Sequence, residues 1–187
     1  KFISCEDLPT YLEYHEFYDF FSYQCQDYVS CFNKGDFCGT KAILQNLFDF
    51  FSERFAKIYL FKIDFSIIIE ILKTSSFLFG MLSAIRTEDI SYVPDCAQFI
   101  ALITFYSEEI AALLSEEDFI YPLTNFYMAN YDLMDDSDRF NTFIAINNLL
   151  DFYNDKSFKV FFENNNYYSL HNIYEGFLRA TDNNNIK

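Results

Sequence analysis

Several residue types that carry chemistry or interrupt helices are scarce in this chain. Its 187 residues include no tryptophan, four glycines, three prolines and two histidines. The scattered glycines form no loop in which a backbone could cradle a phosphate. The histidines, His15 and His171, stand in no arrangement typical of a nucleophilic or metal-dependent hydrolase. The sequence therefore favours a non-catalytic protein without a cofactor.

The chain also lacks a long apolar run and a metal-binding pattern. Its longest uncharged stretch, residues 119–131, has 13 residues and contains a proline, whereas a membrane span needs about 20. Cys25, Cys31 and Cys38 are too widely spaced for the usual zinc clamp. The odd total of five cysteines favours reduced thiols, and hence the cytoplasm or nucleus. The acidic stretch 132–138 lacks the glycine and closing glutamate of a calcium-binding EF-hand loop.

Positive charge is missing from the middle of the chain. The net charge is −15, and residues 87–138 contain twelve acidic residues and no lysine or arginine. Such a chain repels phosphate, so direct nucleic-acid binding is disfavoured. The acidic pairs around residues 108–118 have two readings: a solvated face that keeps the protein soluble, or a docking surface for a basic protein.

One apolar pattern is present three times. Each copy has the spacing i, i+3, i+4, i+7, which places its members on one face of an α-helix. The starts are 55 and 47 residues apart, which is typical of helical repeats that bury their apolar faces by stacking. The copies are Leu44, Leu47, Phe48 and Phe51; Phe99, Leu102, Ile103 and Tyr106; and Ile146, Leu149, Leu150 and Tyr153.

The pattern predicts a unit of three helices. Residues 10–32 are predicted to form one long helix or two short ones, followed by a turn at 33–36. Each unit then has a long helix ending near residue 51, 106 or 153. A short helix follows at 53–59, 108–114 or 156–162, and a third begins after residue 64, 118 or 166. Segment 86–95 and the acidic stretch 135–138 are expected to be loops. The predicted N-caps are Thr40, Ser52, Ser107, Asn154, Asp64, Asp118 and Asn166.

An asparagine precedes a leucine late in two of the long helices, at Asn46 and Asn148, and Ala101 stands at the middle position. With the order of long, short and medium helices, this pattern resembles armadillo repeats over residues 40–181. The resemblance implies an all-α, right-handed α-solenoid of about three repeats. The import-receptor branch of that family has a tryptophan four residues before the asparagine. Here those positions hold Ala42, Ala97 and Ile144, which argues against an import-receptor-like groove.

The predicted organisation is an N-terminal helical or degenerate capping repeat over 1–39, repeats over 40–95, 96–138 and 139–181, and a flexible tail over 182–187. Since the first residue is Lys1, we expect a fragment of a longer array or a trimmed product.

The resemblance implies a scaffold that binds an extended or basic protein segment on its concave face. Asparagines of the long helices would pair with the peptide backbone, and aspartates would meet basic side chains. Two alternatives are a structural subunit buried in a larger assembly and an acidic decoy that mimics nucleic acid. The predicted partner-binding residues are Asn46, Asp49, Ala101, Thr104, Asn148 and Asp151.

Overall fold

The structure, a computed structural model, describes residues 8–61 and 63–152, with side chains for 16–52 and 63–152. This part of the chain forms eight α-helices and no strand, which confirms the all-α prediction. The helices are α1 (Leu8–Asn33), α2 (Phe37–Phe61), α3 (Phe65–Thr74), α4 (Phe77–Ile85), α5 (Val93–Tyr106), α6 (Glu108–Glu116), α7 (Ile120–Asn130) and α8 (Asp136–Leu150).

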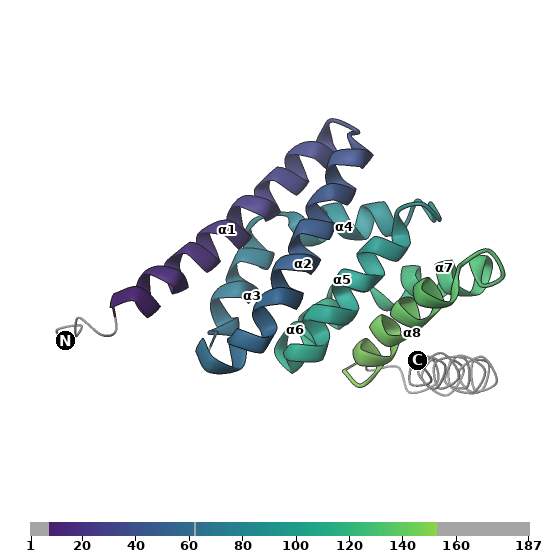
Figure 1. Ribbon diagram of the computed structural model, residues 1–187. Coiled ribbons are helices and arrows are strands. Elements are labelled where there is room, and N and C mark those ends of the chain that lie inside the picture. The colour runs from purple at the N-terminus through teal and green to yellow at the C-terminus, as the bar shows by residue number, and fades with distance from the viewer. Residues whose placement is uncertain (1–7, 62, 153–187) are drawn as a thin grey trace, which may run out of the picture.

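Three helices, α2, α5 and α8, lie side by side and run in the same direction (Figure 1); we call these the long helices. α5 packs between α2 and α8, and α1 packs against the other flank of α2. Pairs of shorter helices, α3 with α4 and α6 with α7, connect the long helices in sequence and lie behind them. α5 and α8 bury one side against short helices, whereas α2 packs chiefly against α1 and α5, and α3 and α4 pack against α1.

The repeated apolar pattern supplies the core between these helices. Leu44, Leu47 and Phe51 of α2 are at most 1% exposed, and Phe99 of α5 is fully buried. The rings of Phe51 and Phe99 meet edge to face, with centroids 6.1 Å apart. Burying an aromatic side chain of this kind removes about 150–250 Å² from water. Tyr153, the last member of the third copy, lies outside the described residues.

Hydrogen bonds of two buried tyrosine hydroxyls connect α1 to later parts of the chain. The hydroxyls of Tyr28 and Tyr92 share a hydrogen bond, and both side chains are buried. Burial raises the pKa of both phenols and of the nearby Cys96 thiol, so all three stay neutral at physiological pH. Further along α1, the Tyr18 hydroxyl accepts a hydrogen bond of 2.9 Å from the Asp64 backbone amide.

Each expected repeat boundary falls in the first turn of a long helix. We placed the boundaries before residues 40, 96 and 139, and α2, α5 and α8 begin at Phe37, Val93 and Asp136. The turn at residues 33–36 is confirmed, with Gly35 at φ +71°. Thr40 is not the N-cap of α2, because Asp36 accepts the hydrogen bond from the Gly39 amide.

The predicted short helix at 53–59 is wrong as a separate element, because α2 continues without a break to Phe61. Ser52 therefore lies inside a helix and does not cap one. The corresponding short helix of the next unit is confirmed as α6. There Ser107 has an extended backbone, with φ −145°, and its hydroxyl accepts from the Ile110 amide at 3.2 Å. The extended residue separates α6 from α5, and Ser52 provides no such break.

The single helix predicted to begin after residue 64 is replaced by two helices, α3 and α4, that meet at a 70° bend. The bend lies at Ser75 and Ser76, where Ser76 has φ +59°. Asp64 caps α3 as predicted, accepting from the Ser66 amide at 2.9 Å. Hydrogen bonds from the Ser66 hydroxyl and amide hold the pKa of Asp64 below its usual value.

Asp118 does not cap α7, because it has φ +64° and makes no capping bond to that helix. It instead follows the end of α6, where the Phe119 amide bonds to the Leu114 carbonyl at 3.2 Å. Pro122 lies in the first turn of α7, where a missing backbone amide hydrogen is tolerated. The loop expected at 86–95 ends earlier, so that Asp95 lies inside α5.

The acidic stretch 135–138 is the start of α8 and not a loop. Asp135 caps this helix by accepting from the Asp138 amide at 2.8 Å, and Asp136 and Asp138 lie in its first turn. Negative side chains there meet the positive end of the helix dipole. Several predicted features lie outside the residues or side chains that the structure describes: His15, His171, Asn154, Asn166, the helix at 156–162 and the tail.

Candidate functional site

The six predicted partner-binding residues lie on the three neighbouring long helices. Asn46 and Asp49 belong to α2, Ala101 and Thr104 to α5, and Asn148 to α8, with Asp151 just after its end. Because α5 lies between α2 and α8, these positions follow the order of the helices across the molecule. Ala101 and Thr104 are nevertheless buried, at 7% and 6% exposed, so a partner could not reach them directly. We call the exposed side of these three helices the long-helix face.

The structure joins three of the six residues directly. The side-chain amide of Asn148 donates to the Thr104 hydroxyl at 3.0 Å and, with a longer bond of 3.5 Å, to the Ala101 carbonyl. Thr104 is 6% exposed, and its own hydroxyl donates to the Ile100 carbonyl at 2.7 Å. Asn148 is half-buried, so its NH₂ group links α8 to α5.

The two α2 residues stand apart from this cluster. Asn46 and Asp49 are exposed, and Gln45 donates to the Asp49 carboxylate at 2.9 Å. Within the described part of the chain, the side chain of Asn46 forms no hydrogen bond, so its amide group is accessible to a ligand. Asp151 is exposed beyond the last turn of α8.

A charged cluster at one end of this face was not predicted. Lys41 of α2 forms an ion pair of 3.1 Å with Asp95 of α5 and donates to the Ser91 carbonyl at 3.0 Å. Asp138 lies near the same cluster. Burial and the carboxylates of Asp135 and Asp95 raise the pKa of Asp138, and Lys41 partly offsets this. Lys41 thus forms an ion pair with Asp95 and also stabilises the charged form of Asp138.

No signal in the repeated pattern could have located this cluster. The apolar register shifts by 47 residues between the second and third copies, which aligns Asp95 with Thr142 and not with Asp138. The carboxylates come together because each lies in the first turn of its own helix, and the starts of α5 and α8 are neighbours.

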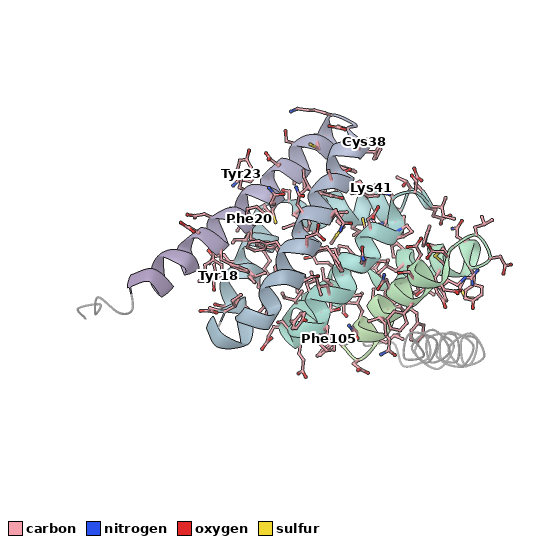
Figure 2. The ribbon with its side chains drawn as sticks, viewed as in Figure 1. Tyr18, Phe20, Tyr23, Cys38, Lys41 and Phe105 are labelled. Atoms are coloured by element: carbon pink, nitrogen blue, oxygen red, sulfur yellow. The ribbon has the colours of Figure 1, made fainter. Side chains whose placement is uncertain are left out.

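An aromatic side chain is exposed at the opposite end of the face. Phe105, in the last turn of α5, is 70% exposed, and Leu102 on the turn before it is half-buried. Figure 2 labels Phe105 at this end and Lys41 near the start of α2. Asp95 and Phe105 are ten residues apart on one helix, which corresponds to about 15 Å. The face therefore has a cluster of one lysine and several carboxylates at one end, and an exposed aromatic side chain with the nearby carboxylate of Asp151 at the other.

Other kinds of site find less support. Among the described residues, no group of three or more His, Cys, Asp or Glu side chains is placed to hold a metal ion. Cys25 and Cys96 are buried free thiols, whereas Cys38 is exposed. In the same part of the chain no single helix has the length and apolarity for a membrane span, although the bent pair α3 and α4 together would pass that test.

Comparisons of the chain with models of protein families, with curated proteins and with solved structures find no match.

Proposed function

We propose that this protein is a non-catalytic scaffold that binds an extended, basic segment of another protein across the long-helix face. The observation that carries the proposal is the alignment of α2, α5 and α8, which places exposed amide, carboxylate and aromatic side chains on neighbouring helices. The spacing of these helices by pairs of short helices supports a right-handed α-solenoid of armadillo-like repeats as the finer description of the fold.

The charge of the face favours a basic partner. Asp49, Asp95, Asp138 and Asp151 belong to the long helices or their ends, and Lys41 already pairs with Asp95. Complementary charge mainly speeds encounter and selects partners, and it contributes less to affinity. Affinity would come from an apolar residue of the partner against Phe105, since exposed aromatic side chains are frequent anchors at interfaces.

The structure also modifies the expected role of the asparagines. The NH₂ group of Asn148 already donates hydrogen bonds to α5 of the same chain, whereas the side-chain amide of exposed Asn46 remains accessible to a partner. In this proposal Asn46 pairs with the partner backbone, and Asn148 holds α5 and α8 at the right separation.

The proposal can be tested with a fluorescent twelve-residue peptide of alternating lysine and leucine, whose binding is followed by anisotropy. Asp49→Asn with Asp151→Asn should weaken binding by about threefold to tenfold, as expected for two exposed ion pairs of up to about 1 kcal/mol each. The matched control is Glu116→Gln with Glu117→Gln, which removes the same charge from exposed positions at the end of α6. Equal weakening by both pairs would show only a general attraction of a cation to an acidic protein, and would contradict the proposal.

A structural subunit of a larger assembly is the second candidate, and one observation favours it. Phe79 of α4 is 70% exposed, and Leu133, after α7, is 72% exposed. Neither residue belongs to a long helix. Exposed apolar side chains away from the long-helix face are what a second, more permanent interface would need.

A further inference from the structure

A small hollow lies away from the long-helix face, where the chain leaves α4 and where α6 meets α7. Its volume is about 230 Å³. None of its lining residues belongs to α2, α5 or α8. The hollow is smaller than the roughly 300–1,000 Å³ of pockets for drug-sized ligands, and it suits a single long side chain. Its lining includes Ile85, Arg86, Glu88, Asp118, Tyr121 and Asn125.

The two acidic residues of the hollow have an unfavourable backbone conformation. Glu88 has φ +55° and Asp118 has φ +64°, in the left-handed region where glycine is the lower-energy choice. Among the described residues other than glycine, only Ser76 shares a positive φ. Two of three such residues therefore line one hollow, and each carries a carboxylate. Residues held in this conformation cluster at ligand sites.

The electrostatics of the hollow favour a cation. Within the described residues, Arg86, Glu88 and Asp118 form no ion pair, although all three line the same space. α4 and α6 both end here; Arg86 is the C-cap of α4, whereas α6 has no basic residue in its last turn and Glu117 as its C-cap. The C-terminus of a helix carries a partial negative charge. These two helix ends and two carboxylates outweigh one arginine and the N-terminus of α7.

The wall of the hollow fits a cation attached to an apolar stem. Tyr121 is 39% exposed, and the face of a tyrosine ring attracts a guanidinium or ammonium group. Ile85 and Pro122 add apolar surface for the methylene groups. We propose that this hollow binds one arginine or lysine side chain of a protein partner, at a site separate from the long-helix face.

The first test is a titration followed by ¹H–¹⁵N NMR, with N-acetyl-arginine-N-methylamide as the probe. The neutral control is the corresponding citrulline compound, which has nearly the same shape. The proposal predicts concentration-dependent shifts of the Tyr121 and Asn125 amides with the arginine probe and smaller shifts with citrulline. Equal shifts with both compounds, or shifts confined to other helices, would overturn it.

The second test separates loss of the site from loss of the fold. Glu88→Gly and Asp118→Gly should each weaken binding of the arginine probe by about twofold to fivefold, as one exposed ion pair would. Because glycine relieves the backbone, both variants should also have a higher unfolding midpoint. Ser76→Gly is the matched control, since it makes the same relief at the other end of α4 and should leave binding unchanged. Glycine variants at Glu88 and Asp118 that bind like the unaltered protein would sink the proposal.

The sign of the effect at Arg86 tests the class of ligand. If the ligand is a simple cation, Arg86→Gln removes a like charge from the hollow and should strengthen binding of the arginine probe. If the variant instead weakens binding, the hollow recognises a ligand with both charges, and the proposal as stated is wrong.

Discussion

The side-chain amide of Asn148 on α8 donates hydrogen bonds to α5. This residue, predicted to bind a partner, therefore has a structural role between two long helices. The sequence placed Ala101, Thr104 and Asn148 together by aligning repeats, and the structure brings these three into contact. It did not predict that Asn148 would bond to Thr104, because the alignment treated both as ligand-binding positions.

We predict that Asn148→Ala lowers the free energy of unfolding by about 1 kcal/mol, because it removes a half-buried hydrogen bond between α8 and α5. Thr104→Val should cost a similar amount, and the double variant should cost less than the sum. Urea unfolding of the four proteins measures this coupling.

Asn147→Ala is the control, because Asn147 is exposed on the same helix and should change stability by no more than about 0.5 kcal/mol. If Asn148→Ala changed the free energy of unfolding as little as Asn147→Ala, the linking role assigned to Asn148 would be wrong.

At the scale of helices, apolar spacing was more informative than capping residues. The helices α5 and α6 were predicted nearly as they occur, because their apolar faces and breaks coincide, and α1 is the first of the two alternatives, one long helix. Ser52 was read as a break by analogy with Ser107, yet no glycine or proline occurs between residues 40 and 79 to interrupt α2 or segment 65–85. The second of these does bend, through the positive φ of Ser76, and the run Thr74, Ser75 and Ser76 is the local turn signal there that the repeat pattern did not use.

The packing between long helices can be tested with two phenylalanines. Phe51 is 1% exposed and its ring contacts Phe17, Phe21 and Phe99. We predict that Phe51→Ala lowers the free energy of unfolding by about 3–5 kcal/mol through lost burial and a cavity. Phe105→Ala should change it by less than about 0.5 kcal/mol, since that ring is 70% exposed.

Chemical denaturation followed by circular dichroism gives both values. A similar loss for the two variants would mean that Phe105 supports the fold and is not available to a partner.

At the scale of the whole molecule, the sequence predicted that three apolar copies would lie on neighbouring helices, and they do as far as the chain is described. The positions of the charged side chains could not be predicted in the same way. The acidic middle segment was evident from composition, but Lys41 with Asp95 and the hollow beside Arg86 depend on which helix ends become neighbours. Such neighbours are set by tertiary packing, which periodicity alone does not encode.

The most direct test of the long-helix face compares two equally exposed phenylalanines. p-Benzoylphenylalanine would replace Phe105 or Phe79 in the full chain, and irradiation in native lysate followed by mass spectrometry would identify the crosslinked segment. We predict that position 105 captures a lysine- or arginine-rich segment, that position 79 does not, and that Asp49→Asn with Asp151→Asn lowers the yield of the captured segment. Absence of capture at position 105, or the same products at both positions, would contradict the account.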